Sequence, residues 1–281
     1  MDRLLIAQLT DTHVLDPVDD GQHWVDNNGR LAEAIESLNN ESPRPDLVVA
    51  TGDMANNGGP EEYTELTRQL SALELPLACV PGNHDDSGSL RSTVGPSTPP
   101  GVEVADASGH YSWWLDLPPA ALGKRPGLRI IGLDTHLPGK DGGCFDDERA
   151  GWLANAISGA EANGFASLIA MHHPPFLSGI EWMDAPGFVG AERFIKLVSS
   201  ARGVDRVICG HLHRPTQAAI NGVTFSVGPS TIQHVALDLE PGSPKQAILD
   251  PVGYQLHTFD GTTWVSHTRY LATGEKPFLF E

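Results

Sequence analysis

The chain has 281 residues, of which 40% are hydrophobic and 19% are charged, a composition typical of a globular protein with a sizeable core. It has 18 lysines and arginines against 36 aspartates and glutamates, so its formal net charge is −18 with histidine neutral. A negative average field repels polyanions, which argues against nucleic acids and anionic membranes as partners. No linker-like segment divides the sequence, so we expect one domain over residues 1–281, with residues 214–281 as its C-terminal β-rich part.

The cysteines and the first residues bear on the cellular compartment. Cys79, Cys144 and Cys209 lie far apart and form no CxxC pair, so a disulfide framework is not expected. The first apolar segment lacks the length and the cleavage site of a signal peptide. No segment approaches the roughly 20 apolar residues of a membrane span. We therefore expect a cytoplasmic protein.

The first part of the chain alternates between apolar strand-like runs and helical patterns. Runs that suit a sheet covered on both faces lie at residues 3–9, 46–50 and 75–80. A helix is expected after Asp26, a capping residue, and another from Gly58-Gly59-Pro60 onward. This β-α-β-α-β order is typical of an α/β fold.

Strands and helices continue to alternate beyond a Pro- and Gly-rich loop at residues 95–101. Strand patterns lie at residues 110–117, 128–134, 167–172 and 206–210, and helical patterns at residues 147–158 and 191–201. The C-terminal part then contains the short β segments QAAI, VTFSV, GYQLHTF and TTWVSHTRY, separated by turn residues. The whole order fits two sheets with helices outside both faces.

Five clusters of chemically active side chains follow the apolar runs. They are Asp11-Thr12-His13, Gly52-Asp53, Gly82-Asn83-His84-Asp85, His172-His173 and Gly210-His211-Leu212-His213. Residues two apart in an extended segment face the same side, so the first Asp and His can reach one ion together. The two histidines of the last cluster can likewise lie at or beside a second ion. Each cluster alone could be an ordinary turn, and Asp134-Thr135-His136 repeats the first one without requiring a function.

Oxygen and nitrogen donors dominate these clusters. Asp53 lies in a turn after Gly52, where its two oxygens could bridge two ions, and Asn83 offers a neutral amide oxygen. Mixed N and O donors suit first-row divalent ions, whereas the scarcity of thiolates disfavours a structural zinc site. Two ions about 3.5 to 4 Å apart can share a hydroxide and bind the non-bridging oxygens of a phosphate. Such a pair would also attract a small anionic substrate despite the acidic chain.

The ordered blocks D-x-H, G-D, G-N-H-D/E, H and G-H-x-H resemble those of the calcineurin-like metallophosphoesterases. The similarity spans residues 11–213, and the segments DTH, RPDLVVATGDMANNGGPEEY, VPGNHDD, MHHPP and CGHLH are most similar to the subgroup with bacterial glycerophosphodiesterases and class III cyclic nucleotide phosphodiesterases. This resemblance implies a four-layer αββα sandwich, in which two mixed β-sheets are flanked by helices. It also implies a dinuclear metal site at the strand ends on one edge.

The resemblance assigns roles to particular residues. It implies that two divalent ions (iron, manganese, zinc or cobalt) are bound by seven residues: Asp11, His13 and His213 at one ion, Asn83, His172 and His211 at the other, and Asp53 at both. His84 is expected to contact the substrate phosphate beside Asn83 and to assist the leaving group, with a supporting role next to Asp85 as the alternative. His234 is a further candidate substrate contact. His173 is expected to be a packed neighbour of the ligands, and His136 to lie at a strand end.

The function implied by the resemblance is hydrolysis of small phosphodiesters, either a glycerophosphodiester or a 3',5'-cyclic nucleotide, by a metal-bridging hydroxide. Alternatives are a phosphomonoesterase of the same fold, a nuclease, which fits the acidic chain less well, and a non-catalytic protein that binds metal or nucleotide. The segment 174–190, with Trp182, Met183 and Phe188, is either a rim or lid over the site or ordinary surface packing. Since relatives assemble, a homo-oligomer, a dimer or higher, is expected.

Overall fold

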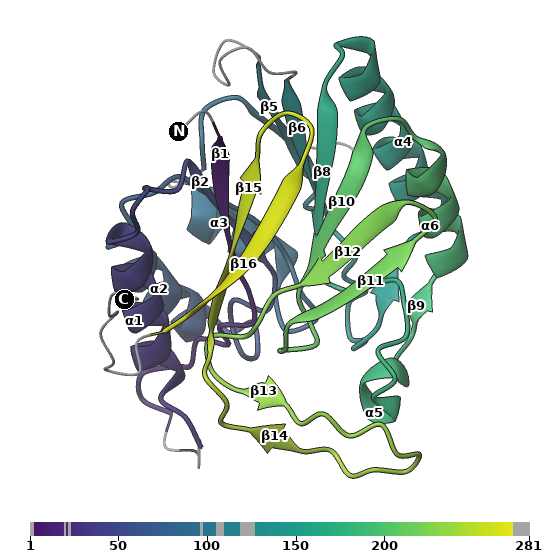
Figure 1. The fold of residues 1–281 in the computed structure, drawn as a ribbon. Helices are drawn as coiled ribbons and strands as arrows, with labels where there is room; N and C mark the ends of the chain where they lie inside the picture. The colour runs from purple at the N-terminus through teal and green to yellow at the C-terminus, as the bar shows by residue number, and fades with distance from the viewer. Residues whose placement is uncertain are drawn as a thin grey trace, which may run out of the picture.

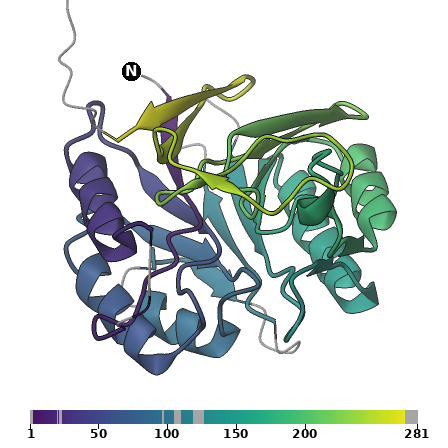
Figure 2. The same cartoon turned by 90° about the horizontal axis from the view of Figure 1, so that it is seen from below.

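Two β-sheets lie next to each other in the centre of the molecule, and helices cover their outer faces (Figure 1). The structure is a computed structural model that describes residues 3–19, 21, 24–95, 98–104, 110–118 and 127–271, and every structural statement below concerns these residues. Seen from below, the purple and blue helices lie on one side of the sheets and the green helices on the other (Figure 2).

The first sheet contains five strands in the order β16-β15-β1-β2-β3. Its strands are β1 (Leu4–Leu9), β2 (Leu47–Thr51), β3 (Leu77–Val80), β15 (Gly253–Phe259) and β16 (Trp264–Tyr270). The first three are parallel, whereas β15 is antiparallel to β1 and to β16. Helices follow these strands, namely α1 (Asn27–Asn39), α2 (Pro60–Leu70) and α3 (Ser87–Val94).

The second sheet contains seven strands in the order β11-β12-β10-β8-β6-β5-β4. They are β4 (Val102–Val104), β5 (Trp113–Leu117), β6 (Leu128–Leu133), β8 (Ala166–Met171), β10 (Val204–Cys209), β11 (Thr216–Ile220) and β12 (Val223–Val227). The four strands β6, β8, β10 and β12 are parallel, and the others are antiparallel to their neighbours. Helices α4 (Asp147–Ala162) and α6 (Ala191–Ser200) cover its outer face.

Short elements lie near the edge where the parallel strands end. The two-residue strands β7 (Gly143–Cys144) and β9 (Phe188–Val189) pair with each other. A second small pair joins β13 (His234–Val235) to β14 (Ala247–Ile248), and the helix α5 (Glu181–Asp184) lies nearby (Figure 1).

Alternate side chains of the second sheet belong to two different hydrophobic layers. Ile130 and Ile208 pack toward the first sheet, whereas their neighbours Ile131 and Val207 pack under α4 and α6. Both faces of these strands are therefore buried, which explains why their sequences are continuously apolar. Burial of each such side chain contributes roughly 1.5–3 kcal/mol. The expected four-layer αββα arrangement of two mixed sheets flanked by helices is confirmed.

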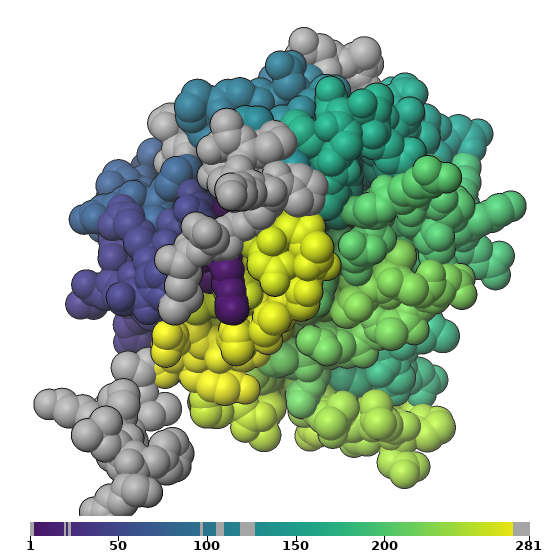
Figure 3. Space-filling view, turned by 45° about the horizontal axis from the view of Figure 1, so that its top comes forward, coloured from purple at the N-terminus to yellow at the C-terminus, as the bar shows by residue number. Residues whose placement is uncertain are grey.

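The C-terminal residues complete both sheets. Strands β11 and β12 extend the second sheet beside β10, and β15 returns to pair with β1 at the other end of the sequence. In the space-filling view the yellow C-terminal residues lie directly beside the purple N-terminal strand (Figure 3). No helix within the described ranges is both long and apolar enough to span a bilayer.

Most expected elements are present, and the differences are local. The strand expected from residue 110 begins at Trp113. Helix α3 was not expected, because its sequence SGSLRSTV has only two buried apolar residues and depends on Asp86, whose side chain accepts a hydrogen bond from the backbone N–H of Ser89. The loop expected at residues 95–101 partly lies outside the described residues.

Candidate metal centre and active site

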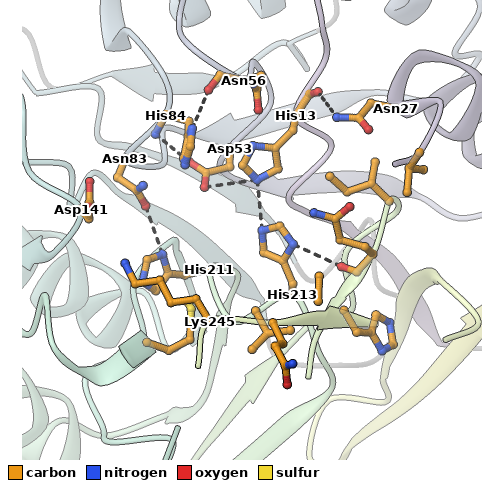
Figure 4. A pocket seen from close by; sticks show the side chains of 18 of the residues that line it. His13, Asn27, Asp53, Asn56, Asn83, His84, Asp141, His211, His213 and Lys245 are labelled. Atoms are coloured by element: carbon orange, nitrogen blue, oxygen red, sulfur yellow. Dashed lines mark hydrogen bonds and ion pairs between the residues drawn. The ribbon is translucent and has the colours of Figure 1, made fainter. Parts of the chain in front are cut away.

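The expected ligands come together at the ends of five strands. Asp11 follows β1, Asp53 follows β2, Asn83 follows β3, His172 follows β8 and His211 follows β10. The side chains of Asp53, Asn83 and His211 line one pocket together with those of His13 and His213 (Figure 4). Asp11 and His172 are fully buried, and they contact two of these lining residues, His213 and Asn83. The ligand atoms therefore form two neighbouring groups.

The first group consists of Asp11, His13, Asp53 and His213, whose donor atoms all lie within 4.8 Å of one another. The Nε2 atoms of His13 and His213 are 3.1 Å apart, and the latter lies 3.4 Å from Oδ1 of Asp11. Two imidazole nitrogens and two carboxylates directed at one point form a donor set suited to a divalent ion.

The second group is centred on the amide oxygen of Asn83. Its Oδ1 atom lies 3.2 Å from Nε2 of His172 and 3.1 Å from Nδ1 of His211. An amide oxygen donates no hydrogen bond, so both imidazoles either donate to it or share a cation with it. The latter arrangement fits a second ion with mixed N and O donors.

Asp53 joins the two groups. Its Oδ2 atom lies 3.6 Å from Nε2 of His13 and 3.3 Å from Nε2 of His172. The other oxygen, Oδ1, accepts a hydrogen bond of 2.9 Å from the backbone N–H of His84. A single carboxylate oxygen thus faces both groups, while its partner oxygen holds the carboxyl group in place.

The backbone is strained at most of these ligands. Among the described residues, six that are not glycine have a positive φ, and five of these are in the candidate site: Asp11 (52°), His13 (42°), Asp53 (52°), His211 (72°) and His213 (55°). The sixth, Asn221, lies in the turn between β11 and β12. Such conformations cost on the order of 1 kcal/mol each and persist where the surrounding structure enforces them. Their concentration here is independent support for a functional site.

Two glycines permit the close approach of the loops. A Cβ atom on Gly82 would lie 2.1 Å from Oδ1 of Asp53, and one on Gly52 would lie 2.5 Å from Nδ1 of His172. Gly52 also has a φ of 92°, which favours glycine. These positions explain why glycine precedes Asp53 and Asn83 in the sequence.

Backbone carbonyls orient the imidazoles. Nδ1 of His172 donates to the carbonyl of Thr51 over 2.7 Å, and Nδ1 of His213 donates to the carbonyl of Gln233 over 3.2 Å. In the neutral ring the other nitrogen, Nε2, then carries the lone pair that would bind a cation. The side chain of Asn27 also donates to the carbonyl of His13 over 2.8 Å.

Burial dominates the electrostatics of the site. It raises the pKa of Asp11, lowers the pKa of His13 well below its usual value and lowers the pKa of His211 to about 3. Burial also opposes ionisation of Asp53, but nearby histidines, above all His172, hold the pKa of Asp53 well below its usual range. Burial opposes the charge on His172 as well, but Asp53 raises the pKa of His172 to about 9, so the positive charge favoured at this position is shared between the two residues. The carboxylate of Asp53 and the neutral imidazoles of His13 and His211 supply electron pairs, so these residues fit divalent cations.

His84 lies at the mouth of the site with an exposed ring. Its Nδ1 atom is 2.5 Å from the carbonyl of Asn56, which requires a proton on that nitrogen. The ring packs edge-on against His13, with centroids 4.6 Å apart. The other nitrogen, Nε2, therefore remains available to a molecule in the cavity.

His234 lies in the wall of the cavity and is 4% exposed. Its Nε2 atom is buried without a hydrogen-bond partner in the described part of the chain. Burial lowers the pKa of this histidine. A buried nitrogen without a protein partner is costly and is often found at functional sites or beside an ordered water.

The cavity has a volume of about 490 Å³, enough for a small organic phosphate. Segment 174–190 forms part of its wall through Trp182, Met183 and Pro186, so this segment borders the site. Lys245, between β13 and β14, extends over the ring of Trp182, with its Nζ 5.8 Å from the ring centroid. Phe188 instead packs near Phe194, with ring centroids 6.3 Å apart.

Several wall residues were not anticipated from the sequence. They are Trp24, Asn27, Asn56, Asp141 and Lys245. Asn56 lies in the conspicuous segment RPDLVVATGDMANNGGPEEY, but nothing there singles it out, and the other four lie outside the five clusters. These positions meet only when distant loops fold together. An exposed Trp24 next to an acidic loop carries no sequence signal that separates it from ordinary surface.

Two further histidines, His173 and His136, lie near the ligands. Nδ1 of His173 is 2.9 Å from Oγ1 of Thr135, and its ring packs edge-on against His172 at 4.8 Å. One nitrogen of His173 also lies within 4.8 Å of one nitrogen of His172 and of His211, but the described hydrogen bonds and ion pairs join His173 to neither Asp53 nor Asn83. His136 lies in the segment that follows β6 and belongs to neither group of ligands. Its Nδ1 atom is 3.5 Å from Oγ of Ser87.

The comparison with protein families agrees with this geometry. The family described as calcineurin-like phosphoesterase matches residues 4–215. The chain belongs to the calcineurin-like phosphoesterase family. The fold is also similar to that of a dimetal phosphatase from Danio rerio, with a TM-score of 0.68, 14% sequence identity and 96% of each chain covered.

Related sequences are named as phosphodiesterases. The chain is 31% identical to a probable glycerophosphodiester phosphodiesterase of Arcobacter nitrofigilis, over 99% of this chain and 97% of that protein. It is 30% identical to a cAMP/cGMP dual specificity phosphodiesterase of Mycobacterium tuberculosis, over 86% of this chain and 71% of that protein. The predicted family and subgroup are thus confirmed.

Proposed function

We propose that this protein is a metal-dependent phosphodiesterase that hydrolyses a small phosphodiester, either a glycerophosphodiester or a 3',5'-cyclic nucleotide. The observation that carries the proposal is the position of Asp53 Oδ2, which faces His13 of the first group and His172 of the second group at once. A shared carboxylate oxygen is what a pair of closely spaced ions needs. The names of the relatives support a diester rather than a monoester.

Two divalent ions would be held by the two groups. Asp11, His13 and His213 would hold one ion, and Asn83, His172 and His211 would hold the other, with Asp53 in contact with both. When bound, such a pair supplies an activated water and neutralises charge on the phosphate. Iron, manganese, zinc and cobalt all suit these donors, so metal analysis of protein purified without chelator is needed to distinguish them.

The protein side chains around the ions would orient the substrate and assist the leaving group. Nδ1–H of His84 is engaged by the carbonyl of Asn56, so protonation of Nε2 would give a donor facing the cavity. That donor would transfer a proton to the departing alkoxide oxygen. Nε2 of His234 and the amide of Asn83 would contact the bound phosphodiester from other sides of the cavity.

A substrate panel tests this proposal. Protein stripped with chelator and reloaded with one metal at a time would be assayed with bis(4-nitrophenyl) phosphate, 4-nitrophenyl phosphate, glycerophosphocholine and 3',5'-cyclic AMP. We expect metal-dependent turnover of the diesters that exceeds turnover of the monoester. Higher activity on the monoester would support a phosphomonoesterase instead. No turnover with two ions bound would support a non-catalytic binding protein.

Two further expectations remain predictions. The first is a homo-oligomer, which size-exclusion chromatography with light scattering tests by measuring the mass of the assembly. The second is a cytoplasmic location, an expectation based on the three cysteines, which are buried and form no disulfide.

A further inference from the structure

Gln8 is a polar residue in the middle of an apolar strand. It lies in β1, is fully buried, and its side chain crosses from the first sheet to the second. Its Nε2 atom donates to the carbonyl of Cys209 in β10 over 2.7 Å and to Oγ1 of Thr51 in β2 over 2.9 Å. A buried amide is costly unless it is fully hydrogen-bonded, so its partners indicate its purpose.

Both partners of Gln8 position a histidine of the second group. Cys209 ends β10 two residues before His211, whose Nδ1 faces Asn83. Thr51 ends β2, and its carbonyl accepts the hydrogen bond that orients His172. The amide of Gln8 therefore contacts the two residues that determine where these imidazoles point.

The strand ends approach each other closely at this position. A Cβ atom on Gly210 would lie 2.2 Å from Oγ1 of Thr10 and 2.7 Å from the carbonyl of Thr51. The spacing between β2 and β10 is thus set by direct contact, and the amide of Gln8 bonds to both sides of that contact. A small shift here would move His211 relative to His172.

A hydrogen-bond chain fixes the orientation of the Gln8 amide. Its Oε1 atom lies 3.0 Å from Nε2 of His257, whose Nδ1 lies 2.7 Å from Oγ of Ser266. That hydroxyl oxygen accepts a hydrogen bond of 3.0 Å from Nη1 of Arg206, so its proton is directed at His257. His257 then donates to Oε1, and the amide hydrogens must be directed at Thr51 and Cys209.

We propose that Gln8 is a positioning residue for the second ion, and that it acts by holding Cys209 and Thr51 at the spacing that lets His211 and His172 bind the same cation. This inference depends on the proposed two-ion site. Partners beyond the direct ligands commonly change metal affinity or activity by about 10- to 100-fold when they are removed.

The first ion has its own supports. Oγ1 of Thr10 donates to Asp11 over 2.7 Å, and the side chain of Asn27 donates to the carbonyl of His13. His213 is oriented by the carbonyl of Gln233. None of these contacts involves Gln8 directly. The two sets of ligands are linked through the backbone N–H of His211, which lies 3.1 Å from each carboxylate oxygen of Asp11, so loss of the Gln8 amide should affect the second ion more than the first.

Gln255 provides a matched control. It is the residue opposite Gln8 in the β1–β15 ladder, is 3% exposed, and also reaches the second sheet. Its Oε1 accepts from Oγ of Ser226 over 2.9 Å, and its Nε2 donates to the carbonyl of Val227 over 3.3 Å. It makes no described hydrogen bond to Cys209 or Thr51. Loss of its amide should lower stability without changing either ion.

The test compares Gln8→Met with Gln255→Met, since methionine keeps the volume and removes the amide. Mn²⁺ is titrated calorimetrically into chelated protein, and exchange coupling between bound Mn²⁺ ions is measured by electron paramagnetic resonance. For Gln8→Met we expect the Kd of the second Mn²⁺ to rise about tenfold or more, the first Kd to change by less than about threefold, and the coupling to change. For Gln255→Met we expect both Kd values and the coupling to match wild type.

Equal Mn²⁺ binding and coupling in wild type and Gln8→Met would overturn the inference, as would an equal effect on both ions. If wild type itself binds fewer than two Mn²⁺ ions, the proposed two-ion site is wrong. This outcome differs from a failure of the Gln8 inference, because it appears without any substitution. Should Gln8→Met not fold, Thr51→Val removes only one hydrogen-bond acceptor of Gln8, and a rise in the second Kd alone again supports the inference. An unchanged second Kd in Thr51→Val would contradict it.

Discussion

The backbone N–H of His84 donates to Oδ1 of Asp53 over 2.9 Å, so the residue proposed to assist the leaving group is tied to the residue proposed to bridge the ions. The side chain of His84 is fixed separately, by the carbonyl of Asn56. Any movement of the loop after β3 would therefore change the ion bridge and the proton donor together. Substitutions can still separate the two roles, because each depends on different atoms.

Asp53→Asn tests the bridge. Asparagine keeps an oxygen for the N–H of His84 but loses the negative charge that faces both groups. We expect elemental analysis to find fewer than two ions per chain. Activity should fall by more than about 100-fold, which exceeds the usual loss when a residue that only supports a metal ligand is replaced. Two tightly bound ions in Asp53→Asn would contradict the bridging role.

Asn83→Ala tests the second ion separately. The Oδ1 atom on which His172 and His211 converge is removed, whereas the first group is intact. We expect a weaker second ion, an unchanged first ion and a fall in kcat on the order of 10²–10³-fold, since a catalytic ion contributes several kcal/mol. Calorimetric metal titration and steady-state assays on the same sample provide the measurement. Unchanged turnover at saturating metal would rule out the assigned role.

His84→Ala should leave both ions bound while slowing turnover. Positioned proton donors contribute about 10²–10⁴-fold, and the loss should be largest for diesters whose leaving groups have a high pKa. A series of aryl and alkyl phosphodiesters measures this dependence. A loss of equal size across the series would show that His84 binds the phosphate without donating a proton.

Trp182→Ala tests the cavity wall formed by segment 174–190. The tryptophan ring borders the cavity beneath Lys245 and is distant from the strand-end ligands in sequence. We expect KM for bis(4-nitrophenyl) phosphate to rise about tenfold, because an aromatic contact is lost, and KM for methyl 4-nitrophenyl phosphate to change less. Equal KM values in variant and wild type for both diesters would place the substrate away from this wall.

The pH dependence of stability should reflect His257. Burial, followed by the charge of Arg206, lowers the pKa of His257 from 6.5 to about 3 in the folded chain. The folded state therefore favours the neutral ring, so its contribution is complete above pH 6.5 and is lost as the pH falls toward 3. Between pH 7 and pH 5 this one group should cost about 2 kcal/mol of unfolding free energy.

Urea unfolding of chelated protein at the two pH values measures this effect. His257→Leu should be less stable than wild type at pH 7, because Gln8 loses a hydrogen bond, but it should lose less stability on acidification. Parallel pH dependences for the two proteins would show that another group is responsible.

Local signals made most of the fold predictable from the sequence. Asp26 caps α1 through the N–H of Gly29, and Pro60 begins α2, as their residue types indicate. The strands are readable because both faces of each sheet are buried. By contrast, α3 depends on packing of Leu90 and Val94 within an otherwise polar segment, and such packing is invisible before the chain folds.

The candidate site was predictable in its order but not in its atoms. The five clusters name the residues that converge, yet only the structure shows that His211 presents Nδ1 to Asn83 whereas His172 presents Nε2. Contacts between distant residues were also hidden: Gln8 and Cys209 are 201 positions apart, and Gln8 is simply one polar residue in LLIAQL. Pairing of this kind depends on three-dimensional proximity.

The left-handed backbone at five of the seven candidate ligands has a thermodynamic consequence. At about 1 kcal/mol apiece, the strain in these loops sums to about 5 kcal/mol, the lower end of the net stability of a typical domain. The free energy of cation binding would offset that strain. Removal of the ions by chelation should therefore increase local opening of the loops that follow these strands. Faster amide hydrogen exchange in those loops would show this increase.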